Sequence, residues 1–241
     1  TKEIEAWLTH ETQKDNVSTF YQNKYTKTGF LNRSGCSIEN PEELITEHIA
    51  AWILKHLDRF EEIKTITRKK TYNCSPDHKG KKSEEKSVRN NRAEEKLAMK
   101  IKKQGSLNYI GKILDYQVPL KNKQCDKAGK IDLLAYDEEK NVLRILELKV
   151  EDSTESMLRC VCESYTYLKT VDPDKLRKDF SLQDKKPDIV ACPLVFKDSA
   201  QYKELHADKA KHPKLLELME KWSIEPFYLA AKGNTYTIEK D

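Results

Sequence analysis

The 241-residue chain is poor in glycine, cysteine and methionine, with 7, 6 and 3 residues. It also lacks a long apolar run. No stretch approaches the roughly 18 apolar residues of a membrane-spanning helix, so we expect no membrane partner. The first residues, TKEIEAWLTH, lack the basic and then apolar pattern of a signal peptide. These absences predict a cytoplasmic protein.

The six cysteines contain no CxxC pair. Cys160 and Cys162 form a CxC on an expected helix, without a His or Cys pair at zinc-site spacing. Cys74 and His78 would need two further ligands from distant residues. We therefore expect free thiols in a reducing cytosol rather than a zinc centre.

Charge is abundant but unevenly distributed. The net charge of the whole chain is only +4, yet residues 64–103 hold 14 Lys and Arg against 5 Asp and Glu, a local charge of +9. Such a block is compatible with binding a phosphate backbone. Its other interpretation is a solvated loop followed by a solvated helix face.

Three regions follow from composition and periodicity. Residues 1–75 are predicted to form a mainly helical accessory region, within which residues 62–73 could hold a short strand. Residues 76–91 contain almost no apolar side chains and predict an exposed basic loop. Residues 92–241 alternate helical and strand patterns in the order α-β-β-β-α-β-α-β-β, which predicts an α/β domain with a mixed sheet and helices on both faces.

The stretch RILELKV at 144–150 places two charges in an otherwise apolar strand. Because strand side chains alternate between faces, Glu147 and Lys149 point the same way, with Cα atoms roughly 6–7 Å apart. Lys and Glu are rarely buried unless they are paired. The structural interpretation is an ion pair on a half-exposed edge strand.

The preceding strand, KIDLLAYD, contains a third charge, Asp132. Two carboxylates on neighbouring strands repel each other unless a cation lies between them. Their oxygens suit a hard ion such as Mg²⁺ or Mn²⁺, and Lys149 would then lie beside the ion. The structural alternative for Asp132 is an ion pair with Lys130 or Lys149.

A fourth acidic group could come from the helix predicted in RAEEKLAMKI. If Leu97, Ala98 and Ile101 pack inward, Glu94 falls on the same stripe and leans toward the sheet, whereas Glu95 is rotated off it. The other interpretation of Glu94 is an ordinary surface acid in a first helical turn, where the helix dipole favours negative charge.

The helix with Glu94, followed by Asp132 and then by Glu147-Leu148-Lys149, resembles the PD-(D/E)XK nuclease superfamily over residues 92–200. The resemblance implies a restriction-endonuclease-like fold with an αβββαβ core. It also implies that Asp132, Glu147, the Leu148 carbonyl and Glu94 bind Mg²⁺ or Mn²⁺, and that Lys149 is the catalytic lysine.

The chain departs from the family pattern at two places. Ile131 stands where the motif name has proline. The Gln and Tyr of the RecB-like branch, four residues apart, correspond to Glu163 and Tyr167. On the same helix, Arg159 or Tyr165 could face the substrate, or could be surface or core residues.

The resemblance predicts a nuclease that acts on nucleic acid, more readily DNA than RNA, as a monomer or a homodimer. One alternative is a nucleic-acid-binding module of the same fold without catalysis. Another is a protein-interaction role in which the N-terminal helices, with Trp7 and Trp52, dock a partner; those tryptophans could equally be core residues.

Overall fold

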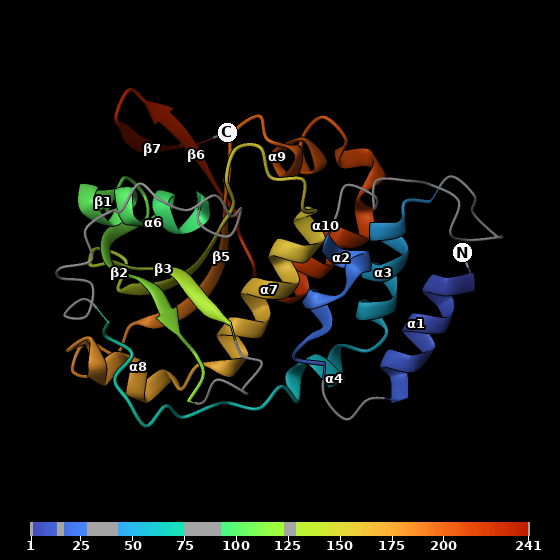
Figure 1. Ribbon diagram of the computed structural model, residues 1–241, viewed down its shortest axis with the longest axis horizontal. Helices are drawn as coiled ribbons and strands as arrows, with labels where there is room; N and C mark the ends of the chain where they lie inside the picture. The colour runs from blue at the N-terminus through green and yellow to red at the C-terminus, as the bar shows by residue number, and fades with distance from the viewer. Residues whose placement is uncertain (1, 14–16, 28–42, 75–92, 123–128, 241) are drawn as a thin grey trace.

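The computed structural model describes residues 2–13, 17–27, 43–74, 93–122 and 129–240. Within these residues, one mixed sheet runs in the spatial order β1 to β7 (Figure 1). Strands β1 to β4 are antiparallel neighbours, β4, β5 and β6 run parallel, and β7 turns back antiparallel. The strands are β1 Ser106–Leu107, β2 Gly111–Pro119, β3 Lys130–Asp137, β4 Val142–Leu148, β5 Asp188–Phe196, β6 Phe227–Lys232 and β7 Thr235–Glu239.

Helices cover both faces of the sheet (Figure 1). Helix α6 packs against β1, β2 and β3, whereas α7 packs against β4 and β5 on the other face. The helices are α1 Lys2–Gln13, α2 Lys24–Lys27, α3 Ile45–Leu54, α4 Leu57–Glu61, α6 Ala93–Gln104, α7 Met157–Thr170, α8 Pro173–Asp179, α9 Ala200–Leu205 and α10 Pro213–Lys221, with 3₁₀ turns η1 Phe20–Gln22 and η4 Lys209–Lys211. The predicted mixed α/β sheet with helices on both faces is therefore confirmed.

Strand β4 is buried on both faces, which explains its nearly continuous apolar sequence. Leu146 and Leu148 join the apolar cluster beneath α6. Leu143 and Ile145 join the larger cluster on the α7 face. Because β4 is a central strand between β3 and β5, the alternative interpretation of a half-exposed edge is wrong, although the ion pair between Lys149 and Glu147 is present.

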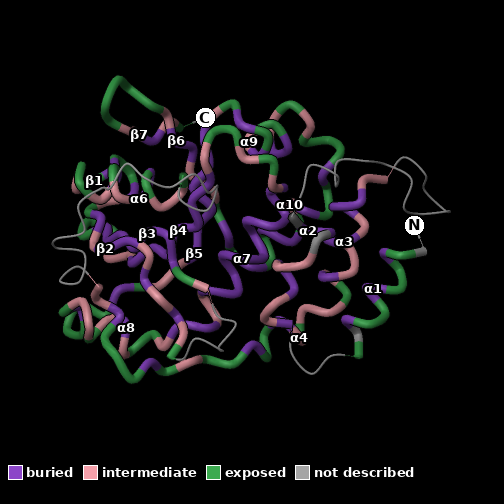
Figure 2. Tube along the Cα trace, in the orientation of Figure 1, coloured by how far each residue is buried: buried purple, intermediate pink, exposed green. Residues whose placement is uncertain are grey.

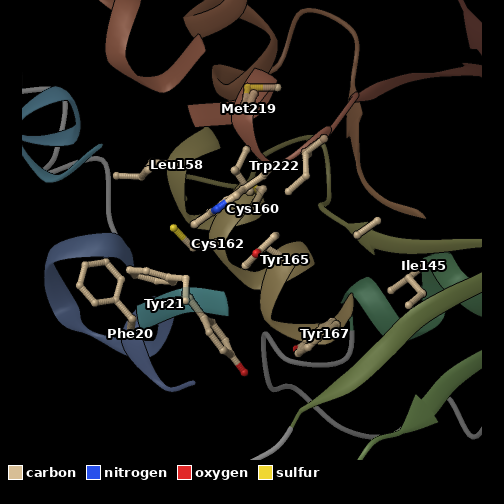
Figure 3. Packing of buried hydrophobic residues seen from close by; sticks show 14 of the residues in the cluster. Phe20, Tyr21, Ile145, Leu158, Cys160, Cys162, Tyr165, Tyr167, Met219 and Trp222 are labelled. Carbon is tan, nitrogen blue, oxygen red and sulfur yellow. The ribbon is translucent and has the colours of Figure 1, made fainter. Parts of the chain in front are cut away.

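The N-terminal helices belong to the larger of these two apolar clusters, together with α7 and α10. Phe20 stacks on Trp52 at a centroid distance of 5.4 Å, and Trp7 packs against Phe20 at 4.9 Å. Phe60 connects this cluster to Trp222, on which Tyr165 stacks at 4.1 Å (Figure 3). Trp7, Trp52 and Tyr165 thus contribute to the core, and Tyr165 does not face the site described below.

Most strands agree with the predicted ones, but several short elements were not anticipated. Helices α8 and α9 and the two-residue strand β1 carry too little periodicity to be recognised. Residues 62–73 form no strand and make only an isolated bridge between Ile66 and Val171. Among the described residues, no helix is long and apolar enough to cross a bilayer.

Candidate functional site

The antiparallel hairpin of β3 and β4 brings Asp132 and Glu147 to the same end of the sheet. Its register pairs Leu133 with Leu146, so Asp132 and Glu147 come next in line and share the α7 face. Asp132 Oδ2 accepts a hydrogen bond from the backbone N–H of Leu148 at 3.0 Å. Its Oδ1 accepts a hydrogen bond from Nε2 of Gln117 at 2.7 Å. Asp132 is therefore held in a fixed orientation by its own strand neighbours.

Lys149 follows the last residue of β4 and lies at the centre of an acidic cluster. Its Nζ donates to Glu147 Oε1 at 2.6 Å and lies 2.8 Å from Glu155 Oε2. It also lies 3.6 Å from Glu94 Oε1 and 3.6 Å from Glu163 Oε2. The Lys149 side chain is only 4% exposed, so these carboxylates replace its water shell.

Arg159, Glu163 and Tyr167 lie on one face of α7 at a four-residue spacing, and Glu155 continues this row just before the helix begins. Arg159 Nε lies 2.9 Å from Glu155 Oε1, and its second terminal nitrogen lies 3.7 Å from Glu163 Oε2. Tyr167 donates its hydroxyl to Glu163 Oε1 at 2.7 Å. A Cβ at Gly129 would clash with that hydroxyl, so the loop before β3 approaches α7 closely here.

The N-terminal turn η1 contacts this row directly. Arg159 donates to the backbone carbonyl of Tyr21, and its guanidinium lies 5.6 Å from the centre of the Tyr21 ring. The same ring packs edge-on against Tyr167 at 6.0 Å. In Figure 3, Tyr21 lies beside the helix that carries Tyr167. Residues far from α7 in the sequence therefore help to position this helix.

The loop between β4 and α7 is anchored by α9. Gln201 donates to the backbone carbonyls of Ser153 and Glu155, at 3.2 and 2.5 Å. Both carboxylate oxygens of Glu204 accept the backbone N–H of Met157, the first residue of α7, at 3.2 and 3.3 Å. These contacts fix the position from which Glu155 reaches Lys149.

Negative charge exceeds positive charge in the cluster. Five carboxylates lie around two cationic side chains: Glu94, Asp132, Glu147, Glu155 and Glu163 around Lys149 and Arg159. Most of these groups are buried, and only Glu94 and Glu155 have substantially exposed side chains, at 30% and 25%. The cluster therefore reaches solvent on the side of these two residues.

The pKa values reflect this excess. Burial, together with repulsion from Glu94, raises the pKa of Asp132 to about 7. Burial and repulsion from Glu163 raise the pKa of Glu147 well above its usual range, and burial raises that of Glu94. Burial lowers the pKa of Lys149, but attraction by Glu147 and Glu163 outweighs burial and raises it. The Lys149 ammonium therefore stays charged, and four carboxylates share this one cation.

The donor chemistry fits a hard divalent ion. Mg²⁺ and Mn²⁺ prefer oxygen ligands, which Asp132, Glu147 and Glu94 supply, and a divalent ion would offset the excess negative charge. As the side chains stand, no three His, Cys, Asp or Glu residues in the described part of the chain are grouped to hold one metal. Because Lys149 occupies Glu147 Oε1, an ion would share Glu147 with the lysine.

The predicted residues Glu94, Glu147 and Lys149 thus meet, and Asp132 lies beside them. Leu148 contributes its N–H to Asp132, while a ligand role for its carbonyl stays a prediction. Asp132 makes no ion pair with Lys130 within the described residues. The basic loop at 76–91 and His78 lie outside those residues.

Sequence reasoning missed Gln117 and Glu155 as parts of this site. The signal for Glu155 was present, because Glu155, Arg159, Glu163 and Tyr167 are spaced four apart. Gln117 carried no such signal, since it lies in a kinked segment of β2 with a positive φ of 51°. Comparisons with protein-family models, curated proteins and solved structures found no match for this chain.

Proposed function

We propose that this protein is a metal-dependent nuclease of the PD-(D/E)XK type that hydrolyses phosphodiester bonds in DNA. The observation that carries the proposal is the convergence of Asp132, Glu147 and Lys149 at one end of a buried hairpin, with Glu94 from the preceding helix. Buried groups with strongly shifted pKa values gather at functional sites. The element order α6, β1, β2, β3, β4, α7, α8, β5 contains the αβββαβ order of a restriction-endonuclease-like core, with the short β1 and α8 added, and this also supports the proposal.

Each residue has a distinct role under this proposal. Asp132, Glu147, Glu94 and the Leu148 carbonyl would hold Mg²⁺ or Mn²⁺. The bound ion would activate a water molecule and neutralise charge on the scissile phosphate. Lys149 would donate hydrogen bonds to that water or to a phosphate oxygen, since its three N–H donors and its permanent charge suit both.

The decisive test is cleavage of a panel of labelled DNA and RNA structures in Mn²⁺. We expect wild type to cut DNA, and Lys149→Ala and Asp132→Asn to abolish cleavage while the circular dichroism spectrum is preserved. Asp137→Asn is the matched control, because Asp137 is an equally buried acid at the other end of β3. Equal cleavage by wild type and the Lys149 and Asp132 variants would overturn the assignment.

One observation favours a second function, a nucleic-acid-binding module without catalysis. Lys149 already contacts four carboxylates, so the cluster could serve as a structural ion network. Calorimetric titration with Mn²⁺ separates the two functions. Binding that disappears in Asp132→Asn and Glu147→Gln supports the nuclease, whereas the absence of such binding supports the module.

A further inference from the structure

Residues 63–73, called the basic strap here, run along the surface beside the site end of the sheet (Figure 1, in teal along the lower edge). The strap carries four basic side chains and no acidic one: Lys64, Arg68, Lys69 and Lys70. Among these, the three lysines are exposed and Arg68 is buried. Figure 2 shows the strap as a mostly exposed stretch of chain with single buried anchor points.

The strap is held firmly against the body of the protein. Tyr72 is fully buried and donates its hydroxyl to the carbonyl of Ile66 at 3.0 Å. The backbone N–H of Ile66 donates to the carbonyl of Thr170, at the end of α7, at 2.8 Å. Arg68 donates to the carbonyl of Pro119, the last residue of β2, at 3.0 Å. The exposed lysines therefore project from a fixed backbone.

Two further lysines join the strap at the end of the β2–β3 pair. The backbone N–H of Lys69 donates to Asn122 Oδ1 at 2.7 Å, and Asn122 Nδ2 donates to the carbonyl of Thr67 at 3.0 Å. These bonds hold Asn122 against the strap, so the backbone of Lys121, the preceding residue, also lies there, and Lys121 is half-buried. Lys130 pairs with Pro119 across the two strands, and its side chain is exposed.

Lys130 links this surface to the site. It lies two residues before Asp132 on β3, so the two side chains share a face and their Cα atoms are roughly 6–7 Å apart. Gly129, one residue earlier, packs on the hydroxyl of Tyr167, which in turn donates to Glu163 in the acidic cluster. Basic side chains therefore lie both on the strap and, at Lys130, on the strand that carries Asp132.

We propose that Lys69, Lys70, Lys121 and Lys130 bind the phosphate backbone of the nucleic-acid substrate and guide it to the acidic cluster. This inference rests on the proposed function and adds to it the surface that holds the substrate. Backbone phosphates are the partner because the surface offers several exposed ammonium groups on a rigid path, which neutralise charge without reading bases.

The test is binding of a labelled DNA oligonucleotide, as single strand and as duplex, in EDTA so that no cleavage occurs. A variant with Lys69, Lys70, Lys121 and Lys130 each changed to Gln is compared with a control in which Lys203, Lys209, Lys221 and Lys232 are changed to Gln. The control lysines are exposed, like Lys69, Lys70 and Lys130, but lie on α9, η4, α10 and β6.

The strap variant is expected to bind about 10- to 100-fold more weakly than wild type. The slope of log affinity against log salt concentration should become less negative by roughly 3, because four phosphate contacts are lost. The control should bind like wild type. Lys130→Gln alone should give a smaller loss in the same direction.

Two results would overturn the inference, and only the second would also overturn the proposed nuclease function. If the strap variant binds DNA like wild type and Lys149-dependent cleavage persists, the strap assignment is wrong and the nuclease proposal stands. If wild type binds neither DNA nor RNA and cuts neither in Mn²⁺, both proposals are wrong.

Discussion

The two ends of the β3–β4 hairpin differ in how their buried carboxylates are balanced by cations. At the turn end, Asp137 pairs with one cation, Arg144, at 3.1 Å and accepts the backbone N–H of Lys140 at 3.2 Å, and the guanidinium also donates to the carbonyl of Ile110 at 2.9 Å. At the open end, Asp132 and Glu147 lie in a cluster where carboxylates outnumber cations. The same two strands thus carry a balanced pair at one end and an unbalanced cluster at the other.

The difference is what the proposed function predicts, with a structural ion pair at one end and a cation-binding cluster at the other. A buried pair is tolerated when each group has an opposite charge and hydrogen bonds, and the Arg144–Asp137 pair meets this condition. At the open end, Lys149 is shared among four acids, and burial together with the remaining repulsion raises the pKa values of Asp132 and Glu147. Folding alone gives no reason to gather so many acids, whereas a site for a cation does.

The largest expected effect comes from removing the cation at each end in turn. Lys149→Ala and Arg144→Ala should each lower the free energy of unfolding by about 3–5 kcal/mol, because each leaves buried carboxylates unpaired. With Mn²⁺ present, the loss caused by Lys149→Ala should shrink, since the ion replaces the missing charge. The loss caused by Arg144→Ala should not change. Denaturant unfolding with and without Mn²⁺ measures both.

An equal loss with and without Mn²⁺ in both variants would remove the distinction between the two ends. The Lys149 cluster would then be a structural ion network of the same kind as the Arg144 pair.

A pH-dependent effect concerns Glu204, a buried acid that accepts the backbone N–H of Met157. Burial raises its pKa to about 8, so the folded protein holds a proton that the unfolded chain releases near pH 4.5. Stability should therefore fall as pH rises from about 5 to 8, by at most about 1.4 kcal/mol per pH unit. Glu204→Gln should flatten this decline, as measured by denaturant unfolding across pH. The same slope in both proteins would show that Glu204 ionises normally.

The smallest effect is expected from loosening the support of Glu155. Gln201→Ala removes two hydrogen bonds to the β4–α7 loop and should cost about 1–2 kcal/mol, with a partial loss of cleavage far below that of Lys149→Ala. Gln104→Ala is the matched control, since Gln104 also donates to two backbone carbonyls but lies away from the site. Equal effects on cleavage rate would contradict a positioning role for Gln201.

Much of the site could be predicted because alternation along a strand is a local property. The spacing of Glu147 and Lys149 placed them on one face, and the position of Glu94 on its helix turned it toward the sheet, where it contacts Lys149. Asp132 followed from the same argument on the neighbouring strand. These inferences needed only the 2- and 3.6-residue periods.

Other parts of the site depend on contacts between residues far apart in the chain. Tyr21 lies 138 residues from Arg159, and Gln201 lies 46 residues from Glu155. No local pattern indicates such contacts. Gln117 was hidden for a different reason, because its unusual backbone conformation appears only once β2 is paired with β3.

The sequence by itself determined the longer strands β2 to β7 and the face of the sheet on which Glu147 and Lys149 lie. These features follow from local periodicity and from the cost of burying charge. Only the tertiary structure decided that Lys149 is shared among four carboxylates, that α9 and the N-terminal turn support α7, and that residues 63–73 lie against the ends of β2 and α7. Those features arise when segments that are distant in sequence pack together and exclude water, which fixes the partners that each buried charge finds.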